Sequence, residues 1–148
     1  MYINRVNTIN LTIPVQTARA MAEQTTLLDS GATENFISFQ TWKQLGIGRQ
    51  ELNKPITVHN VDGTENKKGK ITHYCWLRVL YNRKQKLQKF FMTSLGKDRM
   101  ILRYPFLQEF NPQIDWTEGE LKGGTVALQS TKFRYLKGIF RRAQETLK

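Results

Sequence analysis

Apolar and polar residues alternate along the first part of the chain, and this period of two predicts a β-strand. Ile9, Leu11, Ile13 and Val15 occupy every second position within residues 3–17. Residues 18–24 would then connect this strand to the next. Short runs of the same kind predict further strands at residues 25–28, 56–61, 70–81, 86–93 and 114–121, with residues 82–85 as a hairpin loop and a turn at Glu118-Gly119 inside the last run. The pattern predicts an all-β protein.

Two short segments have a helical pattern instead. In residues 38–45 an apolar residue recurs every third position, Ser38 suits the N-cap and Gly46 suits the end of the helix. Residues 104–110 predict a second short helix, which the sequence Asn111-Pro112 would end.

The C-terminal residues 132–148 combine an apolar stripe with many cations. The stripe consists of Phe133, Leu136, Phe140, Ala143 and Leu147, and the cations are Lys132, Arg134, Lys137, Arg141 and Arg142. Spacing by three and four predicts an amphipathic basic helix. We interpret its stripe first as packing on its own domain or a neighbouring one, with nucleic-acid or membrane contact as the alternative.

Composition narrows the class of protein. A chain of 148 residues, 39% of them hydrophobic, can build one folded domain with its own core. The single cysteine, Cys75, excludes an internal disulfide, suits a core position and favours a reducing, intracellular setting. His59, His73 and this cysteine are too few for a zinc site, and no metal or other cofactor is expected. No apolar run reaches the length of a membrane span, so no membrane partner is expected either.

Positive charge is concentrated in the second half of the chain. The net charge is +11, of which residues 1–74 contribute +2 (8 basic minus 6 acidic) and residues 75–148 contribute +9 (15 basic minus 6 acidic). A basic half suggests a weak or indirect association with nucleic acid, although a solvated basic surface explains the same charge. The chain has no recognisable nucleic-acid-binding motif.

Residues 27–33, Leu-Leu-Asp-Ser-Gly-Ala-Thr, contain the strongest candidate chemistry. The pair Leu27-Leu28 would end a buried strand, Asp29 would stand at the mouth of a tight turn, and Gly31 would let the backbone turn. A carboxylate held in this way can act as a general base on water. Asp-Ser-Gly is also an ordinary turn sequence, and these residues alone do not separate the two interpretations.

Three ordered motifs together resemble the retropepsin-like aspartic protease domains of gypsy-type LTR retrotransposon polyproteins. Residues 27–37 resemble the active-site segment of that family, residues 60–64 and 69–71 its flap hairpin, and residues 100–107 its second signature. Residues 111–116 continue the pattern, and the resemblance covers about residues 10–121. It implies a closed, barrel-like β-subunit with short helices.

The resemblance also implies roles for individual residues. Asp29 would be the catalytic acid and base. The active-site loop that follows it would consist of Ser30, Gly31, Ala32 and Thr33. In this loop the Ser30 hydroxyl would brace the dimer and the Gly31 amide would hold the carboxylate. Val61, Asp62, Gly63 and Thr64 would lie in the flap that closes over a peptide. Ile101 and Leu102 would form the strand beneath the active-site loop.

Aspartic proteolysis needs two carboxylates around one water, and the pair shares a proton because both members cannot easily ionise. Asp29 is the only aspartate in an Asp-Ser-Gly setting, since Asp62, Asp98 and Asp115 lack it. A symmetric homodimer would supply the second copy of Asp29, as the resemblance implies.

Arg103 departs from the family pattern, which has glycine directly after the two apolar residues Ile101 and Leu102. An arginine brings bulk and a charge that is costly to bury unpaired. If it pointed toward Asp29, it would favour ionised carboxylates and lower their shared pKa, which would harm catalysis. If it pointed to solvent, activity would be unaffected.

Three functions follow from the sequence. The first is an aspartic endopeptidase that processes its own polyprotein inside cells or virus-like particles. Its protease domain would be residues 1–121, and residues 122–148 would be a basic linker or helix. The second is an inactive dimerisation or peptide-binding module of the same fold, which Arg103 favours. The third is a basic nucleic-acid-associated module, which the charge of the second half favours.

Overall fold

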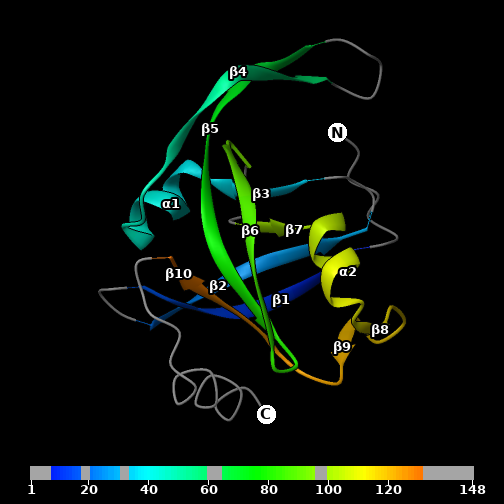
Figure 1. The fold of residues 1–148 in the computed structure, drawn as a ribbon. Helices are drawn as coiled ribbons and strands as arrows, with labels where there is room; N and C mark the ends of the chain where they lie inside the picture. Colours follow the sequence, from blue (N-terminus) through cyan, green and yellow to red (C-terminus); the bar gives the residue numbers. More distant parts are fainter. Residues whose placement is uncertain (1–7, 18–20, 31–33, 60–64, 96–99, 132–148) are drawn as a thin grey trace.

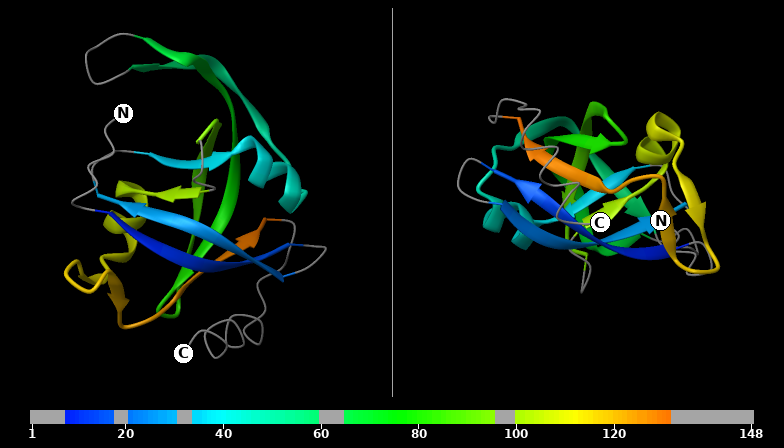
Figure 2. Two further views of the ribbon diagram at one scale, coloured as in Figure 1. Left: turned by 180° about the vertical axis from the view of Figure 1, so that it is seen from behind. Right: turned by 90° about the horizontal axis from the view of Figure 1, so that it is seen from below.

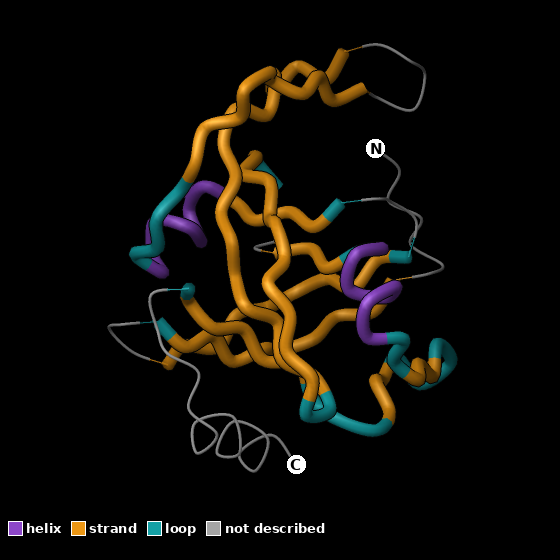
Figure 3. Tube along the Cα trace, in the orientation of Figure 1, coloured by secondary structure: helices purple, strands orange, loops and turns teal. Residues whose placement is uncertain are grey.

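The structure is a computed structural model that describes residues 8–17, 21–30, 34–59, 65–95 and 100–131. Strands account for most of the described chain, and two short helices lie at the sides (Figure 3). The strands are β1 (Thr8–Gln16), β2 (Met21–Asp29), β3 (Asn35–Ser38), β4 (Gln50–His59), β5 (Glu65–Tyr81), β6 (Lys84–Thr93), β7 (Met100–Leu102), β8 (Gln113–Asp115), β9 (Glu120–Lys122) and β10 (Val126–Ser130). The helices are α1 (Phe39–Leu45) and α2 (Tyr104–Phe110).

Seven strands close into a barrel in the order β10-β1-β2-β7-β3-β6-β5, because β5 pairs back with β10. The pairs β1–β10, β2–β7 and β3–β6 are parallel, and the other pairs of the ring are antiparallel. Views from two further directions show β1 and β2 crossing one side of the barrel beside β10 (Figure 2). The predicted all-β, barrel-like fold with short helices is confirmed.

β4 lies outside the ring and pairs only with β5 among the described strands. Together β4 and the first half of β5 form a two-stranded arm that projects beyond the barrel (Figure 1). The last described pair of the arm is His59 with Glu65. The predicted flap residues Val61, Asp62, Gly63 and Thr64 therefore belong to the connection between these strands, outside the described residues.

Alternation along the strands creates two apolar clusters on opposite faces of the sheet. Leu28, Ile37 and Leu102 point into the barrel core, which also contains the buried Cys75. Their neighbours Leu27, Phe36 and Ile101 point the other way, because successive side chains of a strand alternate between faces. These three join Ile71, Phe91 and, from the arm, Leu52 and Val58 in a second cluster. The arm thus covers the outward face of β2, β7 and β3.

Both predicted helices of the described chain are confirmed. The Ser38 side chain accepts a hydrogen bond from the Thr41 backbone N–H at 3.0 Å, and Gly46 ends α1 with a φ of 64°. The second helix occupies residues 104–110, and Asn111 ends it with a φ of 41°. The predicted C-terminal helix lies outside the described residues.

The strand predictions need several corrections. Met21 to Gln24 belong to β2, although residues 18–24 were predicted as a connection, and the strands predicted to start at residues 56 and 70 begin earlier, at Gln50 and Glu65. Strands β3 and β7 were not recognised from the hydrophobic pattern as ring members, because each is short and buried without alternation. The hairpin of β5 and β6 turns on Asn82 and Arg83 alone, whereas residues 82–85 were predicted as the loop. β8 and β9 form the predicted strand pair, but they are not the last strands.

The barrel extends past residue 121, where the sequence placed the end of the domain. β10 pairs with β1 on one side and with β5 on the other, so it closes the ring. Residues 126–130 are therefore a structural part of the barrel rather than linker.

Candidate active site

Asp29 is the last residue of β2 and stands where that strand leaves the barrel. The parallel neighbour β7 is in register, with Leu27 opposite Ile101 and Leu28 opposite Leu102. The next residue along each strand is Asp29 on β2 and Arg103 after β7. The same register that buries the apolar pairs therefore brings these two ionisable residues side by side.

The two side chains form a buried ion pair. Arg103 Nε lies 3.5 Å from Asp29 Oδ2, and the exposed fractions of the two side chains are 1% and 0%. The guanidinium also lies over the Phe36 ring, 4.7 Å from its centroid. Arg103 Nε and Nη2 form no hydrogen bond with the described residues. The Asp29 carboxylate and the Phe36 ring thus contact the guanidinium from the described part of the chain.

Burial and charge act on Arg103 in opposite directions. Burial lowers the pKa of the guanidinium, and the neighbouring Asp29 carboxylate raises it. An arginine keeps its proton in proteins, so the site holds a permanent cation. Of the two directions that the sequence left open, the side chain takes the one toward Asp29.

The backbone at position 103 does not require glycine. Its φ of −132° is accessible to every residue, and its carbonyl accepts hydrogen bonds from the backbone N–H groups of Phe106 and Leu107 at 3.0 and 3.1 Å. Arg103 thus starts α2 as its N-cap without a side-chain cap. The departure from the family pattern changes the charge and volume of the site and adds no backbone strain.

A buried chain of amide side chains fixes the segment that carries Arg103. The Arg103 backbone N–H donates to Asn35 Oδ1 at 2.9 Å, and Asn35 Nδ2 donates to Gln88 Oε1 at 2.9 Å. Gln88 Nε2 then donates to the Pro105 carbonyl at 2.9 Å. These bonds connect β3 and β6 with the junction of β7 and α2, so they position Arg103 relative to Asp29.

Asn35 and Gln88 were not predicted as site residues. They lie 53 positions apart, and nothing in the local pattern of either segment marks a shared network. Polar residues at buried strand positions were the available signal, since Asn35 directly precedes the apolar pair Phe36-Ile37 and the strand containing Gln88 was predicted.

A second ionisable group lies close to the active-site segment. Glu34 directly follows residues 31–33, and partial burial raises its pKa while the positive charge of Lys89 lowers it. The Lys89 ammonium lies over the rings of Tyr74 and Trp76, 4.5 and 5.4 Å from their centroids. These residues give the outward face of β5 and β6 a mixed aromatic and cationic surface.

The structure locates part of the predicted site. Asp29 and Arg103 meet, Ile101 lies in the second apolar cluster, and Leu102 lies in the barrel core. Ser30 is exposed directly after β2. Gly31, Ala32 and Thr33 lie outside the described residues, as do the flap residues.

Neither a metal site nor a membrane-spanning helix occurs in the described part of the chain. No group of three or more His, Cys, Asp or Glu residues there could hold a metal ion. Within the same ranges, no helix has the length and apolar character to cross a membrane.

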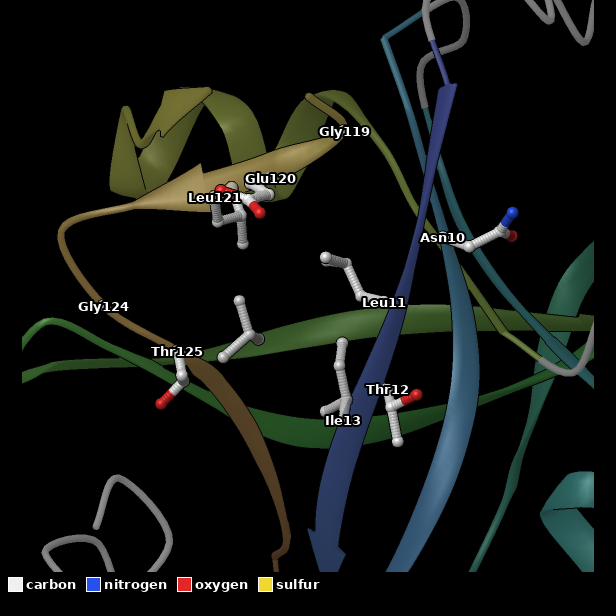
Figure 4. Close-up of a pocket in the computed structure, with 10 residues that line it drawn as sticks. Asn10, Leu11, Thr12, Ile13, Gly119, Glu120, Leu121, Gly124 and Thr125 are labelled. Atoms are coloured by element: carbon white, nitrogen blue, oxygen red, sulfur yellow. The ribbon is translucent and has the colours of Figure 1, made fainter. Parts of the chain in front are cut away.

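A cavity of about 260 Å³ lies away from Asp29, between β1, β9 and the start of β10. Leu11 and Leu121 point toward each other across it, and Asn10 points away (Figure 4). Glu120 is the only ionisable residue among those that line it. The cavity offers apolar volume without a catalytic group, so the candidate site remains at Asp29.

Residues 25–131 match the family model described as PEG10/RTL1 protease domain. Among solved structures, the chain is similar to the retroviral protease-like domain of Ddi1 from Leishmania major, with 12% sequence identity and a TM-score of 0.42. That similarity covers 85% of this chain and 98% of the Ddi1 domain. No curated protein matches the chain.

Proposed function

Because the chain belongs to the PEG10/RTL1 protease domain family, which is retropepsin-like, we propose that it is an aspartic endopeptidase that acts as a homodimer with Asp29 as the catalytic residue of each subunit. The observation that carries the proposal is the position of Asp29. It ends a barrel strand beside β7, on the face that the β4–β5 arm covers. A carboxylate at that place can meet a peptide bound between the barrel and the arm.

One subunit cannot perform the reaction alone, because the mechanism requires two carboxylates around one water. In the proposed dimer the ionised Asp29 takes a proton from water as the water attacks the peptide carbonyl. The protonated Asp29 of the partner donates to the carbonyl oxygen, and return of a proton releases the amine.

The other proposed roles follow the family pattern. Ser30 would brace the two active-site loops across the symmetry axis, and the Gly31 amide would hold the carboxylate. Ala32 and Thr33 would complete the loop, and Val61 to Thr64 would close over the substrate as a flap. Ile101 and Leu102 support this proposal from β7, where both side chains are buried.

The proposed substrate is an extended peptide, bound by strand addition. Its natural source would be a gypsy-type retrotransposon polyprotein, which the chain would process inside cells.

The buried ion pair favours a second candidate function, a catalytically inactive module of the same fold. The guanidinium of Arg103 lies against the Asp29 carboxylate, where the mechanism needs a water molecule and the second carboxylate of the dimer. The Asp29 side chain is also fully buried in the single subunit. Activation of a water molecule, by contrast, requires that water can reach the carboxylate. Such a module would bind peptide or dimerise without cleavage.

Cleavage of a mixed peptide library by the purified full chain at mildly acidic pH distinguishes the two functions. Asp29→Asn serves as the matched variant, and circular dichroism together with sedimentation establishes that both proteins are folded and dimeric. Cleavage by the wild type alone supports the endopeptidase. If neither protein cleaves the peptides but the Arg103→Gly variant does, the fold can support proteolysis and Arg103 prevents it. That result supports the inactive module. Equal cleavage by wild type and Asp29→Asn would contradict the assignment of Asp29.

A further inference from the structure

The outer face of the β5–β6 hairpin carries aromatic, aliphatic and cationic side chains beyond the β4 arm. β4 begins opposite Tyr74, so the arm pairs with β5 only up to that position. Directly after it, Trp76 stands opposite Lys89 and Arg78 stands opposite Leu87. These four side chains share the outer face, because the residue between Trp76 and Arg78 points into the barrel core. We call Trp76, Arg78, Leu87 and Lys89 the hairpin surface.

Two large apolar side chains of the hairpin surface are open to solvent. Trp76 is 36% exposed and Leu87 is 46% exposed. The register makes them diagonal neighbours across the two strands, within reach of one ligand. A single exposed apolar residue needs no explanation, but an indole and a leucine side by side form an apolar contact point. The indole adds a flat ring on which another ring can stack.

Lys89 is held beside this indole by aromatic contacts. Its ammonium lies 4.5 Å from the centroid of the Tyr74 ring and 5.4 Å from that of Trp76. The two rings meet edge to face at a centroid distance of 6.1 Å, which fixes the orientation of the indole. Glu34 borders this group, since burial raises its pKa and the charge of Lys89 lowers it. The contacts place a positive charge and an exposed aromatic ring next to each other.

Arg78 supplies a second positioned cation on the same face. Its Nη1 donates to Gln129 Oε1 at 2.8 Å, across the pairing of β5 with β10. This bond holds the half-buried guanidinium on the outer side of the barrel. Arg78 and Lys89 are diagonal neighbours in the ladder, a relationship that puts their backbone positions about 7–8 Å apart. The hairpin surface thus presents two separate positive charges on either side of its apolar side chains.

The positive charge continues toward the turn of the hairpin. Residues 70–95 contain six lysines or arginines and no aspartate or glutamate. Two of these cations, Arg83 and Lys86, are exposed near the turn at the far end of the hairpin from the arm (Figure 1). A third, Lys84, faces α2, where it pairs with Glu109 at 3.2 Å. A ligand that runs along the hairpin would therefore meet positive charge throughout, which favours an extended polyanion.

We propose that the hairpin surface binds single-stranded nucleic acid, with a base stacked on Trp76 and the flanking phosphates at Lys89 and Arg78. Planar bases alternate with phosphates along a single strand, so one ligand matches both the exposed indole and the positioned cations. An acidic polypeptide would match the cations alone, and a duplex keeps its base faces inside the stack. This binding does not rest on the proposed endopeptidase activity, because no residue of the hairpin surface belongs to the site at Asp29.

Fluorescence anisotropy of a labelled oligothymidine of about 16 nucleotides, titrated with the full chain at low salt, tests the proposal. We expect saturable binding, with an affinity that falls as salt rises because bound phosphates release counterions. An unlabelled single strand of mixed sequence should displace the probe at lower concentration than the duplex form of that sequence. No binding at low salt, or a duplex that competes as strongly as the single strand, would overturn the proposal.

Tryptophan variants locate the stacking contact. Trp76→Leu should weaken binding roughly fivefold or more, because it removes the ring on which a base stacks. Trp76→Phe keeps a ring and should retain most of the affinity. Trp116→Leu is the matched control, since Trp116 is 39% exposed and lies outside the hairpin surface, and it should bind like the wild type. Circular dichroism establishes that each variant is folded. Equal affinities of Trp76→Leu and Trp116→Leu would overturn the proposal.

Lysine variants separate a defined site from general attraction by the net charge of +11. Lys89→Gln should weaken binding and make the salt dependence shallower by about 0.7 in log–log slope, as loss of one phosphate contact predicts. Lys54→Gln removes an exposed cation from β4 and should change both quantities less. These variants decide the matter even if Trp76→Leu fails to fold. Equal effects of the two lysine substitutions would overturn the proposal, as would displacement of the probe by polyglutamate at the same concentration of charge.

Discussion

Arg103 Nε lies 3.5 Å from Asp29 Oδ2, and both side chains are enclosed by the protein. The parallel register of β2 and β7 dictates this pairing, since each residue directly follows a paired leucine. A buried ion pair is weak evidence of stability in itself, but removal of one member takes away the opposite charge that faces the other buried side chain. The site is therefore energetically sensitive to changes at either position.

A double-mutant cycle should show strong coupling between these residues. Asp29→Asn and Arg103→Met are each expected to lower the free energy of unfolding by about 3–5 kcal/mol, and the double variant by clearly less than the sum. Urea unfolding measures all four proteins. The partly exposed pair Lys84–Glu109, at 3.2 Å, is the control and should couple by about 1 kcal/mol or less. Additive effects at positions 29 and 103 would contradict the ion pair.

Asn35 should be the most sensitive polar residue of the barrel interior. Asn35→Leu leaves the Arg103 N–H and Gln88 Oε1 without their present partner, and each unsatisfied buried group costs about 1–3 kcal/mol. Asn53→Leu, at an exposed position on β4, is the matched control and should change stability little. Equal losses in the two variants, measured by urea unfolding, would exclude a structural role for the amide network.

Cys75 should make the protein less stable at alkaline pH. Burial raises the pKa of its thiol from 9.0 to about 12, so the folded state keeps a proton that the unfolded state loses. The thiol's contribution is complete below about pH 9 and is lost as the pH rises toward 12, at up to about 1.4 kcal/mol per pH unit. Urea unfolding at several pH values should show this decline in the wild type. A decline of the same slope in Cys75→Ala would assign it to other groups.

Elements with a strong local signal could be predicted from the sequence. The helix at residues 39–45 has its N-cap serine and its left-handed glycine where the pattern put them, and β1 follows the alternation of Ile9 to Val15. β10 could not be predicted in this way, because all of its residues are buried and alternation requires one wet face. The extent of the domain was misjudged for the same reason.

The site was predictable only in part. Asp29 could be identified because its neighbours specify a strand end and a turn, and Arg103 could be identified as a departure from a pattern. The direction of the Arg103 side chain depends on the register of β2 with β7, which joins residues more than seventy positions apart. The amide network depends likewise on contacts between distant segments.

A substitution in the two-residue turn of the β5–β6 hairpin is expected to increase the stability of the protein. Asn82 and Arg83 have φ values of 50° and 68°, a region that costs a residue other than glycine or asparagine about 1–2 kcal/mol. Arg83→Gly should therefore stabilise the protein by up to about 1 kcal/mol. Lys86→Gly, at a strand position of the same hairpin, should destabilise it by about 0.5–1 kcal/mol. Thermal unfolding compares the two, and a loss of stability in Arg83→Gly would contradict the turn geometry.

The most direct test of the central claim mixes subunits. Wild-type and Asp29→Asn chains, refolded together in varied proportions, are assayed for cleavage of one peptide. If both copies of Asp29 in a dimer are required, activity follows the square of the wild-type fraction, and an equal mixture retains about one quarter of it. Activity in direct proportion to the wild-type fraction, about one half in an equal mixture, would contradict the shared site because each subunit would then act alone.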